Sequence, residues 1–140
     1  MNNIEKAVEL LKNENYTLVA VSDNEEITST QRGVKPLLEI LDSRKNLHEF
    51  SVADKVIGKA VAFLYVLLDV REIYTDVISK SALDVLKNHE INIEYKTLTE
   101  AIKNRSNTGF CPMETAVKNT GDPETALFLI REKLKQISGH

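Results

Sequence analysis

The chain has 140 residues, of which 42% are hydrophobic and 28% are charged, and its formal net charge is −3. This length and composition predict one globular domain over residues 1–140, and the charge excludes the basic surface with which proteins bind duplex nucleic acid. A single cysteine and three histidines exclude an internal disulfide and a cysteine-rich zinc site.

In chain order, the first half of the sequence predicts a helix, a β-hairpin and two further helices. The helices follow from apolar residues at helical spacing, and the hairpin follows from two short β-rich runs separated by turn residues. The expected bounds are Ile4–Asn13 for the first helix, Tyr16–Val21 and Glu26–Thr30 for the hairpin, Val34–Ser43 for the second helix and about Val52–Leu68 for the third.

The second half predicts strands that alternate with helices. The expected strands are Glu72–Ile78, buried on both faces, and Ile91–Tyr95. The expected helical segments are Ser79–Asn88, Leu98–Lys103, Met113–Lys118 and Pro123–Ile137. A hairpin followed by alternating strands and helices predicts an α/β fold, a three-layer α/β/α sandwich on a mixed sheet.

The N-terminus and the longest apolar run bear on location. Met1–Glu5 has neither the basic nor the apolar region of a signal peptide. Ala60–Leu68 is far shorter than the ~20 residues that span a bilayer, so it is expected to form a core helix. With the single thiol, which suits a reducing compartment, these features predict a cytoplasmic protein with no membrane partner.

Gly58 and Lys59 stand where a charged segment meets this apolar helix, which makes them candidates for a site. Lys59 is interpreted either as a desolvated lysine that holds an anionic ligand or takes part in catalysis, or as one that extends to solvent. Gly58 either allows a backbone or ligand to approach closely or is a helix irregularity. Asp54 lies three residues after Ser51, the spacing of a helix capping box, and otherwise would face Lys59 and bind a polar ligand.

Cys111 is the second catalytic candidate. Pro112 at a first helical position places Cys111 at the N-cap, where free N–H groups and the helix dipole favour a thiolate. The thiol is then a nucleophile or a ligand contact. The alternative is a structural cap, with Glu114 at N3 completing a capping box instead of acting as a base.

Three further residues are candidates for ligand binding. Arg32 follows the hairpin, where it either clamps a phosphate or carboxylate or is solvated. Asn107 lies in the polar loop before Cys111, and Ser79 follows the first predicted parallel strand. Polar residues at strand ends gather at one edge of an α/β sheet, where ligands bind. We therefore expect one pocket, lined by Asp54, Gly58, Lys59, Ser79, Cys111 and Glu114.

The order of elements also resembles the cytidine deaminase-like fold. In that fold the buried helix opens with H-x-E or C-x-E and a later helix opens with P-C-x-x-C, which bind zinc and carry its proton shuttle. Here the corresponding segments read Gly58-Lys59-Ala60 and Ser79-Lys80-Ser81-Ala82-Leu83, without a metal ligand. The resemblance therefore implies the fold without zinc, and no metal or other cofactor is expected.

Four segments more closely resemble the DUF1893 proteins, a prokaryotic family of unknown function that shares this fold without its zinc. They are Arg32-Gly33-Val34-Lys35-Pro36-Leu37-Leu38, Asp54-Lys55-Val56-Ile57-Gly58-Lys59-Ala60, Val77-Ile78-Ser79 and Thr108-Gly109-Phe110-Cys111-Pro112-Met113-Glu114. This resemblance implies a family but no activity.

Two functions follow as hypotheses. In the first, the domain binds a small polar or anionic ligand in a pocket near Lys59 and Cys111. In the second, it is a non-catalytic interaction domain that associates with further copies of itself to form a homo-oligomer. These residues then only cap helices and pack. The sequence identifies neither the ligand nor a reaction.

Overall fold

The computed structural model describes residues 1–102 and 111–138. Strands and helices alternate along this part of the chain. The strands are β1 (Leu18–Val21), β2 (Glu26–Ser29), β3 (Ser51–Ile57), β4 (Glu72–Ser79) and β5 (Asn92–Thr99). The helices are α1 (Asn3–Asn13), α2 (Lys35–Asp42), α3 (Lys59–Leu67), α4 (Lys80–Asn88), α5 (Pro112–Ala116) and α6 (Pro123–Ser138).

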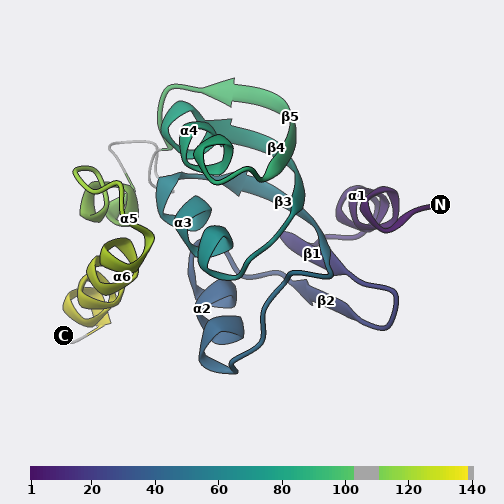
Figure 1. The fold of residues 1–140 in the computed structure, drawn as a ribbon, viewed down its shortest axis with the longest axis horizontal. Coiled ribbons are helices and arrows are strands. Elements are labelled where there is room, and N and C mark those ends of the chain that lie inside the picture. The colour runs from purple at the N-terminus through teal and green to yellow at the C-terminus, as the bar shows by residue number, and fades with distance from the viewer. Residues whose placement is uncertain (103–110, 139–140) are drawn as a thin grey trace.

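The strands form a mixed sheet with the order β2-β1-β3-β4-β5 (Figure 1). β1 is antiparallel to both β2 and β3, whereas β3, β4 and β5 run parallel to one another. The hairpin and the parallel strands that follow it confirm the predicted mixed sheet. The three parallel strands end at one edge of the sheet, where β3 leads into α3 and β4 leads into α4; we call it the carboxyl edge.

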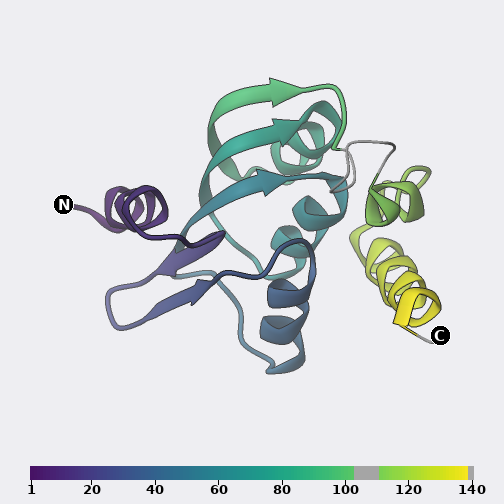
Figure 2. The same ribbon diagram turned by 180° about the vertical axis from the view of Figure 1, so that it is seen from behind.

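Helices cover both faces of the sheet (Figures 1 and 2). On one face, Ala7 and Leu11 of α1 pack against Val19, Ala53 and Tyr74 of the sheet. α2, α3 and α4 cover the opposite face, and α5 and α6 pack on the outer side of α3. The chain is thus an α/β sandwich, as the sequence predicts.

α3 is the buried centre of this sandwich. The sheet lies on one side of it and α6 on the other, and Phe63, Leu64 and Tyr65 have no exposed surface. A helix enclosed in this way needs no polar face, which explains its almost continuous apolar sequence. The prediction of a core helix over Ala60–Leu68 is confirmed.

The prediction of one long helix from Val52 to Leu68 is wrong. Ser51–Ile57 form β3, and the helix begins only after Gly58. β3 is hydrogen-bonded to β1 on one side and to β4 on the other. Two ladders of backbone hydrogen bonds, together with several β-branched side chains, stabilise the extended conformation over the helical one.

The capping box predicted for Ser51 and Asp54 is wrong for the same reason, because both residues lie in the strand. The Ser51 hydroxyl donates a hydrogen bond of 2.6 Å to Oε2 of Glu72 on the neighbouring strand. Ser51 therefore links β3 to β4 and caps no helix.

β5 is longer than predicted. Leu98 and Thr99 belong to the strand, not to the predicted helical segment Leu98–Lys103. The pairing of β5 with β4 continues as far as Ser79 and Thr99, so a ladder with a distant segment extends the strand beyond its local signal.

In the part of the chain that the structure describes, no helix combines the length and apolarity needed to cross a membrane.

Candidate functional site

Two of the predicted site residues are helix N-caps at the carboxyl edge. Gly58 is the N-cap of α3, directly after β3, and Ser79 is the N-cap of α4 at the end of β4. Ser79 is fully buried, and its hydroxyl accepts a hydrogen bond from the Ala82 backbone N–H at 3.2 Å. This cap accounts for Ser79 in structural terms.

α3 has no cap from its own N-cap residue, and Glu114 of α5 supplies one. Oε1 of Glu114 accepts a hydrogen bond of 2.7 Å from the Lys59 backbone N–H, and Oε2 accepts one of 2.9 Å from the Ala60 N–H. A carboxylate at this position satisfies two free N–H groups and interacts favourably with the helix dipole. Glu114 therefore joins the C-terminal helices to the core helix.

This contact requires glycine at position 58. A Cβ atom built on Gly58 would lie 2.6 Å from Cδ of Glu114 and 2.7 Å from its Oε1, far inside van der Waals contact. The sequence predicts that a backbone or a ligand comes close to Gly58. The group that approaches is a side chain of the same protein.

The Lys59 side chain contacts the same short helix. Its Nζ donates a hydrogen bond of 3.1 Å to the backbone carbonyl of Lys118, just beyond α5, and lies 5.7 Å from the centre of the Phe63 ring. Lys59 and Glu114 thus form reciprocal contacts between α3 and the α5 segment. The predicted pairing of Lys59 with Asp54 is wrong.

Cys111 is the N-cap of α5, as predicted, but the predicted capping box with Glu114 is absent. The Cys111 side chain makes no cap hydrogen bond, and the Glu114 carboxylate is bound to the N-terminus of α3 instead. The thiol is half-buried and packs partly against the core.

Asp54 has a partner that the sequence analysis missed. The hydroxyl of Tyr65, on α3, donates a hydrogen bond of 2.5 Å to Oδ2 of Asp54. Oδ1 of Asp54 accepts a second bond of 3.2 Å from the Val56 backbone N–H. Tyr65 has no exposed surface, whereas Asp54 is half-buried. The pair therefore links the buried centre of α3 to a residue of β3 that keeps part of its surface exposed.

This environment changes the acidity of both groups. Burial raises the pKa of the Asp54 carboxyl from 3.8 to about 7, although the hydrogen bond from Tyr65 and those from the Val56 and Lys55 backbone oppose the change. Burial, with the nearby charge of Asp54, raises the pKa of Tyr65 well above 10.0. Asp54 therefore changes charge near neutral pH while Tyr65 remains a hydrogen-bond donor.

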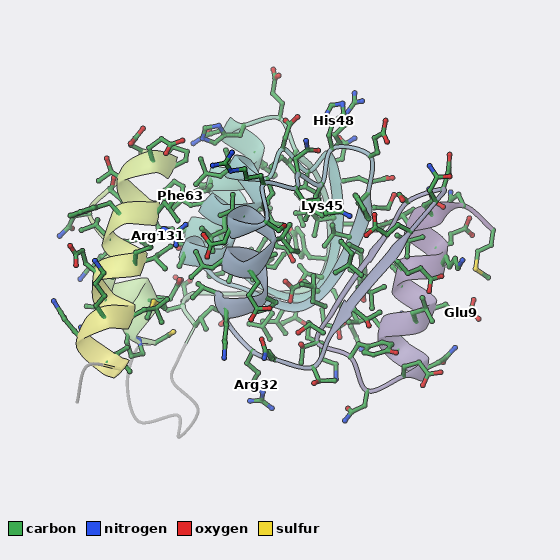
Figure 3. The ribbon with its side chains drawn as sticks, turned by 90° about the horizontal axis from the view of Figure 1, so that it is seen from below. Glu9, Arg32, Lys45, His48, Phe63 and Arg131 are labelled. Carbon is green, nitrogen blue, oxygen red and sulfur yellow. The ribbon has the colours of Figure 1, made fainter. Side chains whose placement is uncertain are left out.

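The other candidates stand apart from this pair or outside the described residues. Arg32 lies between β2 and α2, is exposed, and points away from the body of the protein (Figure 3). Asn107 lies outside the described residues. Of the predicted set, the structure brings Gly58, Lys59 and Glu114 into direct contact; Asp54 instead points at Tyr65.

Two surface hollows lie elsewhere. One, of about 540 Å³, lies between β2 and α2, and its lining includes Tyr16, Leu18, Ser29 and Pro36. The other, of about 460 Å³, lies at the C-terminal end of α1 and is lined in part by Lys55 and Asp76. Neither is lined by Gly58, Lys59 or Cys111.

The side chains also bear on metal binding. Across residues 1–102 and 111–138, no group of three or more His, Cys, Asp or Glu side chains is placed to hold a metal ion. The first turn of α3 presents backbone N–H groups, which are donors, and these are bound to Glu114. Such a donor set does not suit a cation.

Comparison with known proteins identifies the family. A crystal structure of a DUF1893 family protein (TM1506) from Thermotoga maritima has a TM-score of 0.84 and 28% sequence identity, over 96% of this chain and 90% of that chain. A search of curated proteins finds no match. The family model described as a domain of unknown function (DUF1893) matches residues 6–134. The chain therefore belongs to the DUF1893 family.

Proposed function

We propose that this protein binds a small polar ligand on the α3 side of β3, with the Asp54 carboxyl as the principal contact. The observation that carries the proposal is the hydrogen bond of 2.5 Å from the buried Tyr65 hydroxyl to the carboxyl of Asp54, a residue that is only partly buried. A buried tyrosine fixes one oxygen of Asp54 in place. Fixed, partly desolvated polar groups of this kind are typical of binding sites.

The chemistry of the pair favours a ligand that donates hydrogen bonds. With a pKa of about 7, Asp54 accepts hydrogen bonds when ionised and also donates one when protonated. Tyr65 already donates to it, so the remaining lone pairs suit an amine, amide or hydroxyl group of a ligand. An anion is disfavoured, because the Lys59 backbone N–H is bound to the Glu114 carboxylate and the Lys59 ammonium group donates to the Lys118 carbonyl.

In this proposal the protein has the cytidine deaminase-like fold but not the zinc chemistry of that fold. Support comes from the passage of β3 into the buried helix α3 and of β4 into α4. The first turn of α3, where that fold carries a ligand and a proton shuttle, here reads Gly58-Lys59-Ala60 and is capped by Glu114. In this proposal Asp54, held by Tyr65, provides the chemistry of the site.

A thermal-shift screen with polar metabolites tests the proposal. A ligand that binds only the folded state raises the melting temperature by mass action. Asp54→Asn keeps the size of the side chain and an acceptor for Tyr65 but removes the charge. We expect a hit to stabilise the wild type strongly and the Asp54→Asn variant much less.

The matched control is Asp84→Asn, which makes the same change at an exposed position on α4. This variant should respond to the hit as the wild type does. A hit that stabilises all three proteins equally, or a library of amines, amides and polyols without any hit, would contradict the proposed role of Asp54.

A further inference from the structure

The two outer strands of the sheet, β2 and β5, differ in how they are protected from pairing with a further strand. β2 has only four residues, and its Glu26 is held by an ion pair of 2.8 Å with Lys6 of α1. β5 has eight residues, pairs with β4 on one side, and is exposed along most of its length. A long exposed edge strand offers unpaired backbone N–H and C=O groups to a further strand.

The side chains of β5 point to both faces of the sheet. Glu94 is in register with Tyr74, which packs under α1, so Glu94 and Lys96 belong to the α1 face. Figure 1 shows that α1 lies over β1 and β3 and leaves the β5 end of this face open. Tyr95 is in register with Thr75 and belongs to the opposite face, where 38% of its surface is exposed.

Glu94, Tyr95 and Lys96 form a pattern that is complementary to itself. If two copies of β5 pair antiparallel about a two-fold axis at Tyr95, each Glu94 lies directly opposite a Lys96 of the other copy. The two tyrosines then face each other on the opposite side of the sheet. Glu94 and Lys96 form no ion pair with any described residue of their own chain, so both are available for this contact.

Neighbouring registers are disfavoured by charge. Two residues that lie opposite each other in an antiparallel pair have their side chains on the same face of the sheet. A two-fold axis between two copies of β5 must therefore place one residue opposite the same residue of the other copy. An axis at Glu94 would place two carboxylates opposite each other, and an axis at Lys96 would do the same with two ammonium groups. The axis at Tyr95 also lies near the middle of Asn92–Thr99, so no other register pairs a greater length of strand.

We propose that two copies of this protein associate through β5, in antiparallel pairing about a two-fold axis at Tyr95, to form one continuous sheet of both copies. The contact uses backbone hydrogen bonds along β5, two Glu94–Lys96 pairs on the α1 face and the Tyr95 pair on the other. It does not involve Asp54, so it is independent of the proposed ligand.

Reversal of the two charges, one at a time and together, tests this pairing. Glu94→Lys places two pairs of lysines opposite each other and Lys96→Glu places two pairs of glutamates, so each should weaken dimerisation about tenfold. The double variant Glu94→Lys/Lys96→Glu restores two opposite-charge pairs and should dimerise about as tightly as the wild type. Sedimentation equilibrium at low salt measures the dissociation constants.

Glu9→Lys on α1 is the matched control for Glu94→Lys, because it changes the net charge by the same amount at an exposed position that Figure 3 shows pointing away from the protein. It should leave dimerisation unchanged. A monomeric wild type overturns the proposal. Single reversals that leave the dissociation constant of the dimer unchanged also overturn it. So does a double variant that dimerises as weakly as the single variants.

A cross-link tests the register independently of charge. In a Cys111→Ser background, Tyr95→Cys places two thiols opposite each other at the axis, within about 4.5–5.5 Å between Cβ atoms. Mild oxidation should give a covalent dimer from this variant and none from Glu9→Cys in the same background. Equal cross-linking of both variants, or of neither, overturns pairing at Tyr95.

Discussion

The Glu114 carboxylate accepts a hydrogen bond of 2.7 Å from the Lys59 backbone N–H, and the Lys59 ammonium group donates one of 3.1 Å to the carbonyl of Lys118 at the other end of α5. Glu114 thus caps α3, and Lys59 binds the turn that follows α5. The N-terminus of the most buried helix is closed by a side chain from the C-terminal part of the chain, which stabilises the position of α5 and α6 on the core.

Glu114→Gln should destabilise the protein by about 1–3 kcal/mol, because the amide keeps one acceptor oxygen but lacks the charge that the two N–H groups of α3 require. Urea denaturation, followed by circular dichroism, measures the change. Glu49→Gln makes the same substitution at an exposed position and should have little effect. Equal midpoints for the two variants would show that the cap contributes no stability.

Gly58→Ala should also destabilise the fold, by about 1–3 kcal/mol, because its Cβ would lie 2.6 Å from Cδ of Glu114. The substitution should cost less in a Glu114→Ala background, where the obstructing carboxylate is absent. Gly121→Ala is the matched control, since a Cβ at Gly121 has no neighbour within 4 Å. Additive effects of the two substitutions would argue against a steric conflict between them.

Local sequence patterns predict much of this fold but not the central strand. The apolar run after Gly58 identifies α3, and the two β-rich runs before α2 identify the hairpin. The sequence predicts a helix from about Val52, because a short segment of mixed residues fits both periods. β1 and β4, which lie far from it in sequence, supply the hydrogen bonds that make it a strand.

At the candidate site, too, local sequence patterns do not identify contacts between residues that lie far apart in the chain. The sequence predicts that a backbone or a ligand approaches Gly58, but the group that approaches is the side chain of Glu114, 55 residues from Lys59, to which it is bound. Tyr65 was missed, although a signal exists. A tyrosine inside a helix predicted to be wholly buried needs a polar partner for its hydroxyl. The pattern cannot identify that partner as Asp54, because the contact depends on how α3 crosses the sheet.

Tyr65→Phe should raise the pKa of Asp54 above about 7, because the hydrogen bond from Tyr65 lowers that pKa and burial raises it. The variant should also lose about 1–2 kcal/mol of stability with the hydrogen bond. Carbon-detected NMR of the Asp54 carboxyl group against pH measures the midpoint. Tyr16→Phe, which alters a hydroxyl on the α1 face of the sheet, should leave it unchanged. A midpoint that falls in Tyr65→Phe would contradict the assigned donor.

The raised pKa of Asp54 also predicts how stability depends on pH. Below about pH 3.8 the carboxyl is protonated in both the folded and the unfolded state. Between about pH 3.8 and about pH 7 the unfolded chain loses this proton and the folded protein keeps it, so the folded state binds more protons and its stability falls as the pH rises. Above about pH 7 the loss is complete, and it is of the order of 2–4 kcal/mol.

Asp54→Asn isolates this contribution, because the amide does not titrate. The free energy of unfolding of the wild type minus that of Asp54→Asn should decrease steadily between about pH 4 and about pH 7 and become constant above that range. Other carboxyl groups cancel in the difference. The corresponding difference for Asp84→Asn, at an exposed position, should stay nearly constant. A difference for Asp54→Asn that is also constant across this range would mean that the folded protein ionises Asp54 as readily as the unfolded chain does.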